Sequence, residues 1–112
     1  MTQPGPVTVI CTYRVASEHD DTFRDLLSKH WPALHEQGLT TTTPPQFFRG
    51  LDNANAPFYV EIFEWADETA PSTAHNTPAV LAVWEGMGQC CEERLGLPAM
   101  EFPHVEPVKL NG

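Results

Sequence analysis

The hydrophobic residues of the chain follow two different spacings in alternating segments. Four segments are rich in β-branched and aromatic side chains and are predicted to form strands: residues 7–15, 46–50, 58–65 and 100–108. Apolar residues recur at helical spacing from Phe23 to Leu34 and from Val80 to Leu95, so each of these segments is predicted to form a helix. The order βαββαβ predicts an α+β fold of the ferredoxin-like type, in which a four-stranded antiparallel sheet carries two helices on one face.

Local signals predict where the two helices begin and end. Ser17 is predicted to cap the first helix, and Gly38 is predicted to follow its last turn. Thr77 is predicted to cap the second helix with Pro78 at the first helical position, where the missing N–H costs nothing. Gly96 is predicted to close that helix.

Length and charge narrow the class of protein. A chain of 112 residues is expected to form one domain, residues 1–112. Its 15 acidic and 6 basic residues give a net charge of -9. Nucleic acids and anionic membranes are bound through Lys and Arg, so neither is expected as a partner. With no apolar run near the roughly 20 residues of a membrane span and no secretory signal visible, we expect a cytoplasmic location.

The cysteines and histidines do not form a recognisable metal or disulfide pattern. Cys11, Cys90 and Cys91 are odd in number and two of them are adjacent, which is typical of reduced, buried thiols. No histidine and carboxylate share a helical metal-binding spacing. We therefore expect no metal site.

The strand at residues 58–65 is apolar on both faces. One face carries Phe58, Val60 and Ile62, and these are predicted to point into the core. The opposite face carries Tyr59, Glu61, Phe63 and Trp65. Such a set of aromatic side chains, if exposed, marks an interface or a ligand site. We therefore predict that two sheets pack face to face in a homodimer and enclose this second face.

Glu61 is the charged residue in that aromatic set. A carboxylate among aromatic rings needs a partner or takes a raised pKa. Arg14 and Arg49 lie on the neighbouring predicted strands and are the expected partners. Glu61 is then either a buried polar anchor for a ligand or one half of a plain salt bridge.

The segment FYVEIFEWADETAPSTAHNTPAV resembles the third strand and following helix of the antibiotic biosynthesis monooxygenase group of dimeric α+β barrels. The resemblance rests on an apolar strand that ends in Glu64 and Trp65, an acidic turn at Asp67, His75 about ten residues later, and Pro78 opening the next helix. The order of elements matches over nearly the whole chain. The resemblance implies a homodimer with a pocket between the sheet and the helices of each subunit.

In characterised members of that group, the pocket oxidises phenolic or quinol-type polycyclic substrates with O₂ and without metal or flavin. The resemblance therefore implies that this chain acts on a small aromatic molecule and needs no cofactor. His75 is the candidate catalytic residue. The candidate ligand-binding residues are Tyr59, Glu61, Phe63, Trp65, His30, Arg14 and Arg49. Aromatic side chains would hold a flat substrate while polar side chains orient it.

Several of these residues also have a purely structural interpretation. Histidine is a common catalytic group because its side chain titrates near neutrality, but His75 can equally hold the loop before Pro78 by hydrogen bonding. Trp65 can stack on a ligand or simply fill the core. His30 lies on the apolar stripe of the first helix beside Trp31, where it could supply a second polar group to the pocket.

The haem-degrading branch of the same group fits less well. Members of that branch carry an Asn on a strand, together with a Trp and a His in the region of the second helix. The first strand here, VTVICTYRV, contains no Asn, and Glu85 stands ten residues after His75 where a histidine is needed. We therefore do not expect haem degradation.

Two classes of function remain open from the sequence. The first is a cofactor-independent monooxygenase that acts on an aromatic or quinol-type metabolite. The alternative is a non-catalytic dimeric barrel that binds a small hydrophobic ligand. No nucleophile–base–orienter set is visible in the sequence, so the enzyme interpretation depends on the resemblance.

Overall fold

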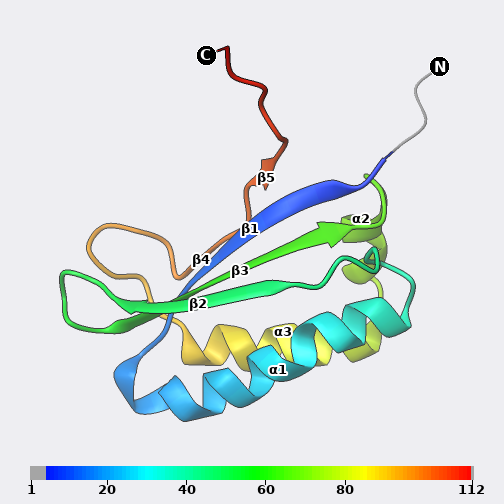
Figure 1. Ribbon diagram of the computed structural model, residues 1–112. Coiled ribbons are helices and arrows are strands. Elements are labelled where there is room, and N and C mark those ends of the chain that lie inside the picture. The colour runs from blue at the N-terminus through cyan, green and yellow to red at the C-terminus, as the bar shows by residue number, and fades with distance from the viewer. Residues whose placement is uncertain (1–4, 112) are drawn as a thin grey trace.

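The computed structural model describes residues 5–111 and shows a sheet with helices packed against one of its faces (Figure 1). The strands are β1 (Val7–Arg14), β2 (Gln46–Leu51), β3 (Pro57–Trp65), β4 (Met100–Glu101) and β5 (His104–Val105). The helices are the 3-10 turn η1 (Ser17–His19), α1 (Asp20–Glu36), the short α2 (Ala70–Ala74) and α3 (Pro78–Cys90). The predicted βαββαβ order is confirmed, with two small helices and a divided last strand added to it.

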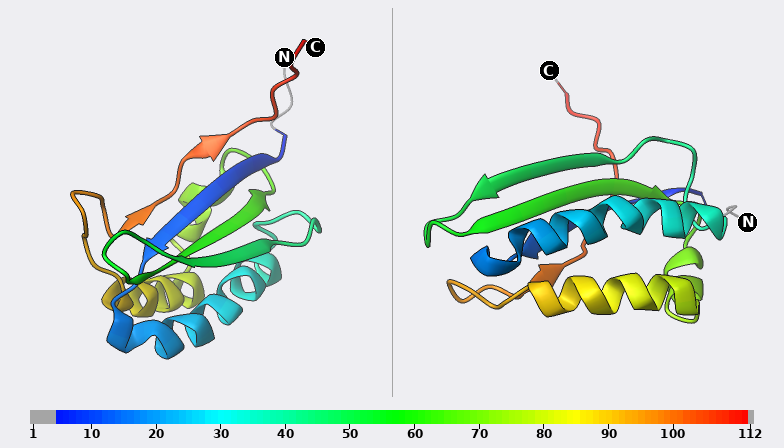
Figure 2. Two further views of the ribbon diagram at one scale, coloured as in Figure 1. Left: turned by 60° about the vertical axis from the view of Figure 1, so that its left-hand side comes forward. Right: turned by 90° about the horizontal axis from the view of Figure 1, so that it is seen from below.

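The sheet has the strand order β2-β3-β1-β4, and β5 also pairs with β1. All of its pairings are antiparallel. The two central strands pair along their whole length, from Val7 opposite Trp65 to Arg14 opposite Phe58. Helices α1 and α3 run beneath this sheet and leave its other face open (Figures 1 and 2).

The predicted facing of β3 is wrong. Tyr59, Glu61, Phe63 and Trp65 are buried against the helices, whereas Phe58, Val60 and Ile62 are only half-buried on the open face. The larger aromatic side chains fill the wide space between sheet and helices, and the smaller aliphatic ones remain on the open side. The register agrees, because Arg14 and Thr12 of β1 stand opposite Phe58 and Val60.

The ends of the helices differ from the prediction in two places. Ser17 opens the turn η1 instead of capping α1, which begins at Asp20 without a side-chain cap. Helix α3 begins at Pro78 after Thr77, as predicted, but it ends at Cys90, several residues before Gly96. Because α3 stops there, Leu95 lies outside it on an exposed turn with a positive φ.

The C-terminal strand is shorter than predicted and is divided. Only residues 100–101 and 104–105 pair with β1, and the following residues form no strand as far as residue 111. The division falls at Phe102 and Pro103, since proline has no N–H to donate to a ladder. The chain after β5 extends away from the body of the molecule (Figure 1).

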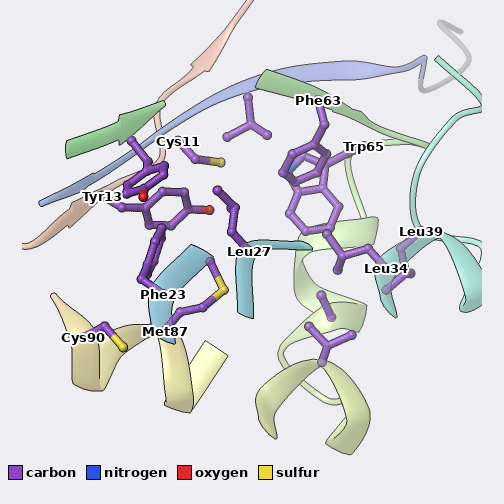
Figure 3. Packing of buried hydrophobic residues seen from close by; sticks show 14 of the residues in the cluster. Cys11, Tyr13, Phe23, Leu27, Leu34, Leu39, Phe63, Trp65, Met87 and Cys90 are labelled. Carbon is purple, nitrogen blue, oxygen red and sulfur yellow. The ribbon is translucent and has the colours of Figure 1, made fainter. Parts of the chain in front are cut away.

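The core lies between the sheet and the two long helices. Tyr13 of β1 packs on Phe23 of α1 with ring centroids 5.1 Å apart, and Phe23 in turn packs on Tyr59 at 5.0 Å. Figure 3 shows Tyr13 and Phe23 at one end of the cluster and Trp65, beside Leu34, at the other. No helix among residues 5–111 is long and apolar enough to span a bilayer.

Helix α1 ends in the geometry predicted for Gly38. Gly38 has φ +72°, its N–H donates to the carbonyl of His35, and the N–H of Leu39 donates to the carbonyl of Leu34. This pair of bonds satisfies carbonyls at the helix end, and the left-handed backbone strains any residue with a Cβ.

We expect Gly38→Ala to lower the free energy of unfolding by about 1 kcal/mol. Gly88→Ala is the matched control, because Gly88 lies inside α3 and an added Cβ would meet only the Met100 methyl at 3.7 Å. Alanine favours a helix over glycine, so this second change should raise the free energy of unfolding by up to about 1 kcal/mol. Urea denaturation of the two variants measures both effects, and shifts of the same sign would contradict the expectation.

Candidate functional site

A cavity of about 290 Å³ lies between the helix-covered face of the sheet and the helices. Its wall draws on every long element except β2, and it is mostly aromatic and sulfur-containing. The lining residues are Val9, Cys11, Tyr13, His30, Phe63, Trp65, Pro71, His75, Trp84, Met87, Met100, Phe102 and His104. A cavity of this size and apolar character is near the lower end of the range for small-molecule sites.

A buried carboxylate lies behind one wall of this cavity. Glu61 is 0% exposed, and its carboxylate accepts hydrogen bonds from the Tyr13 hydroxyl at 2.7 Å and from His30 Nδ1 at 2.8 and 3.1 Å. Burying a charge without partners is unfavourable by several kcal/mol. The two donors, which come from β1 and α1, offset that penalty and fix the carboxylate in place.

The other ring nitrogen of His30 is also engaged. The Trp84 indole N–H donates to His30 Nε2 at 2.7 Å. Because Nε2 accepts that bond, it carries a lone pair, and the ring proton must then lie on Nδ1, from which it is donated to Glu61. The chain of hydrogen bonds therefore holds His30 as a neutral imidazole of one defined tautomer.

Aromatic contacts continue around the cavity wall. Phe63 meets His30 edge-on at 5.8 Å between ring centroids and meets Trp65 at 5.0 Å. On the opposite side, the exposed His75 lies edge-on to Trp84 at 4.8 Å. Such edge-to-face pairs fix the orientation of the rings. The wall reaches solvent at His75.

Trp65 presents a polar group that the protein itself does not satisfy. Its indole N–H is buried, and within residues 5–111 it has no hydrogen-bond partner. A buried donor left without an acceptor is unfavourable by about 1–3 kcal/mol. A ligand oxygen in the cavity is one way to satisfy it.

Burial controls the protonation of the other polar groups. Burial and the nearby Glu61 carboxylate raise the pKa of the Tyr13 phenol, which therefore stays a hydrogen-bond donor at neutral pH. The same two causes raise the pKa of the Cys11 thiol. Burial raises the pKa of Cys91, outside the cavity, to about 12. The thiols of Cys11 and Cys91 therefore remain protonated and weakly nucleophilic.

Neither arginine predicted to pair with Glu61 does so. Arg14 points to the open face of the sheet, where it donates to Glu101 at 2.7 Å and to the carbonyl of Pro98. Arg49 on the edge strand β2 donates to Asp20 at 2.7 Å. The pairing is wrong because Arg14 alternates to the opposite face from Glu61, and β2 brings Arg49 nearer the start of α1.

Tyr59 is buried but lies away from the cavity. Its hydroxyl donates to Asp20 at 2.6 Å, and its ring lies beneath the Arg49 guanidinium at 5.9 Å. With Arg24 and Phe47 it borders a second, more open hollow of about 400 Å³ at the β2 edge. Of the residues predicted to bind ligand, the structure brings Phe63, Trp65 and His30 together with His75, and it separates Tyr59, Arg14 and Arg49 from them.

Sequence reasoning missed Tyr13 and Trp84, the two other members of the hydrogen-bonded group around Glu61 and His30. Tyr13 was assigned only to the first strand, and Trp84 fell within the second predicted helix without a role in the site. The alternation of Val9, Cys11 and Tyr13 along β1 was a usable signal, since all three line the cavity. Nothing in the local sequence of Trp84 indicates its bond to His30, which is 54 residues away.

Within residues 5–111 no cluster of three metal-binding side chains is present.

Comparison with known proteins identifies the fold. No protein-family model matches the chain, and no curated protein matches it. Among solved structures it is similar to an antibiotic biosynthesis monooxygenase, with 16% identity over 92% of this chain and 99% of that chain and a TM-score of 0.69. It is also similar to SnoaB, a cofactor-independent oxygenase from Streptomyces nogalater, with 16% identity over 95% and 96% of the two chains and a TM-score of 0.64.

A third similar structure is Rv0793 from Mycobacterium tuberculosis, with 11% identity over 96% of this chain and 100% of that chain and a TM-score of 0.65. At such low identities the similarity establishes the fold. The chain has the ferredoxin-like α+β fold of the antibiotic biosynthesis monooxygenase-like proteins, as its resemblance to that group indicated.

The bond from Tyr13 to Glu61 should contribute strongly to stability, because it is a hydrogen bond to a fully buried carboxylate. We expect Tyr13→Phe to lower the free energy of unfolding by about 2 kcal/mol. Tyr59→Phe removes the matched bond to the partly exposed Asp20 and should have a smaller effect. Urea denaturation of both variants compares them, and an equal or larger loss for Tyr59→Phe would contradict this account of Glu61.

Proposed function

We propose that the protein binds a small, flat, hydroxylated aromatic molecule in the cavity and oxidises it with O₂ without a cofactor. The observation that carries the proposal is the cavity itself, which combines aromatic walls with the unpartnered N–H of Trp65. Aromatic rings favour a flat ligand, and a buried donor favours a ligand that places an oxygen beside it. The similarity to an oxygenase that works without a cofactor supports the same assignment.

The chemistry would proceed through the substrate anion. A base takes a proton from an anthrone- or quinol-type substrate, and the anion reduces O₂. With an anthrone, the CH₂ carbon loses two hydrogens and gains one oxygen, and the second oxygen atom leaves as water. The substrate supplies all four electrons. The Trp65 N–H would stabilise the oxyanion, a role in which a fixed donor is worth much more than in water.

A proton acceptor is also needed on the cavity wall. His75, the candidate from the sequence, lies at the exposed end of the cavity, and His30 lies on its buried side. An imidazole is a common general base, and these two histidines are the candidates for that role here.

The second candidate function is binding without catalysis. The observation in its favour is that both ring nitrogens of His30 are already hydrogen-bonded within the protein. In that case the cavity would hold an aromatic ligand, and the polar groups around Glu61 would serve only to stabilise the fold.

Oxygen consumption with 1,8-dihydroxyanthrone distinguishes the two functions. We expect protein-dependent oxygen uptake above the autoxidation rate, together with formation of the anthraquinone. Trp65→Phe should lower kcat on the order of a hundredfold, because it removes a donor to the oxyanion. Trp31→Phe is the matched control, since its indole N–H is likewise buried and unpartnered within residues 5–111 but lies outside the cavity.

The control variant should retain the wild-type rate. Tight binding of the anthrone with no oxygen uptake above background would reject the oxygenase and leave the binding function. Loss of activity in Trp31→Phe as large as in Trp65→Phe would reject the role given to the Trp65 N–H.

We further propose that two copies of the chain associate through the open face of the sheet, as the resemblance implies. The facing of β3 changes the chemistry of this interface from aromatic to largely aliphatic. The face carries Ile10, Phe48, Val60, Ile62 and Val105. Phe48 is 55% exposed on the edge strand, and an apolar sheet face of this kind favours burial against another surface. Arg14 and Glu101 form an ion pair on this face.

We expect the protein to sediment as a dimer and Val60→Lys to sediment as a monomer, because the new charge would be buried at the centre of the interface. Leu81→Lys is the control, since Leu81 is exposed on α3, away from the sheet. Sedimentation velocity at matched concentrations measures both. A monomeric wild type, or a dimer that tolerates Val60→Lys, would contradict the proposed interface.

A further inference from the structure

The hydrogen bonds around His30 have the arrangement of a base held ready by an orienting carboxylate. Glu61 fixes the proton on Nδ1, and the lone pair of Nε2 is directed at the Trp84 N–H, which is itself part of the cavity wall. A carboxylate behind an imidazole sets its tautomer and stabilises the imidazolium that forms when Nε2 takes a proton.

We propose that His30 is the general base of the cavity, that Glu61 is its positioning residue, and that the Trp84 indole occupies the place of the substrate hydroxyl until a ligand binds. This inference rests on the proposed function for the kind of ligand. It goes beyond that function because it assigns the proton transfer to one nitrogen atom.

The proton transfer is balanced within the cavity. The O–H bond of a phenolic or enolic ligand breaks, its proton binds His30 Nε2, and the electron pair stays on the ligand oxygen. Trp84 Nε1–H, released from His30, then donates to the new oxyanion. The imidazolium is flanked by the Glu61 carboxylate on one side and the ligand anion on the other, so the transfer leaves the net charge of the buried site unchanged and places a cation between the two anions.

Burial distinguishes His30 from the other two histidines that line the cavity. His30 is 2% exposed and is backed by a carboxylate, whereas His75 and His104 are exposed and form no ion pair with a carboxylate among residues 5–111. In a water-excluded site the electrostatic effect of Glu61 on the imidazolium is strongest. The remaining titratable groups on the wall, Tyr13 and Cys11, have raised pKa values through burial and stay protonated.

The same geometry narrows the class of ligand. Nε2 needs a proton donor, so the preferred ligand has an ionisable hydroxyl. A carboxylate ligand would instead meet the negative charge of Glu61, and among residues 5–111 no lysine or arginine lines the cavity to offset it. An aryl ether of the same shape would leave the bond between Trp84 and His30 in place.

4-Nitrophenol and 4-nitroanisole form a suitable pair of probes, because they differ only in the ionisable hydroxyl. We expect the bound nitrophenol to ionise more readily than in water, which is seen as the absorbance of nitrophenolate. The ¹⁵N shifts of His30 should change from the neutral Nδ1–H form to imidazolium, and the Trp84 indole resonance should move. Nitroanisole should produce neither change in His30.

Four variants test the assignment with nitrophenol. His30→Gln should abolish the enhanced ionisation. Glu61→Gln keeps an acceptor for His30 but removes the charge, and should reduce the ratio of ionised to neutral bound probe about tenfold, which is one pKa unit of the probe. Trp84→Phe should also reduce it. His35→Gln, on the exposed side of the same helix, is the matched control and should behave as the wild type.

The outcomes separate this inference from the proposed function. Ionisation of nitrophenol without oxygen uptake from the anthrone would reject the oxygenase and leave His30 as the base. Ionisation that survives His30→Gln but is lost in His75→Gln would overturn the assignment. A wild-type protein in which His30 stays neutral with millimolar nitrophenol, whether or not the probe binds, would overturn it too and needs no variant that folds.

Discussion

The packing of the two long helices on the sheet depends on one carboxylate that is buried away from water. Glu61 lies at the middle of a central strand, and no lysine or arginine neutralises it within residues 5–111. Two hydrogen-bond donors from different elements, Tyr13 and His30, offset the free-energy penalty of burying this carboxylate. His30 in turn accepts a hydrogen bond from Trp84. One polar group thus joins β1, β3, α1 and α3. Replacing only one partner leaves the others buried and unsatisfied, so the four elements are energetically coupled there.

Much of the architecture could be predicted from local sequence. The β-branched runs, the helical spacing and the glycine after α1 each specify their own element, and their order determines the topology. The facing of β3 could not be read from β3 alone, because it is apolar on both sides. The neighbouring strand β1 indicates the facing, because Thr8, Thr12 and Arg14 on one of its faces are more polar than Val9, Cys11 and Tyr13 on the other. To transfer this facing to β3, the register between β1 and β3 must be known.

The site was less predictable than the fold, for a physical reason. The residues that line it were partly visible, because aromatic and histidine side chains on core-facing positions are conspicuous. Their partners were not, since the bonds of His30 to Glu61 and to Trp84 span 31 and 54 residues. Such contacts are set by how α1 and α3 pack on the sheet, and no local pattern records that packing. Charge alone suggested arginine partners, but Arg14 alternates to the opposite face and Arg49 donates to Asp20 at the start of α1.

The part of the cavity wall formed by the divided C-terminal strand is joined to the sheet by fewer residue pairs than the central strands are. Eight residue pairs join β1 to β3, whereas β4 and β5 are each joined to β1 by two, with Pro103 between them. Phe102 and His104, which line the cavity there, are exposed on their outer side. Local opening needs least free energy where few hydrogen bonds must break. This segment is therefore the part of the cavity wall that separates from the sheet with the least free energy.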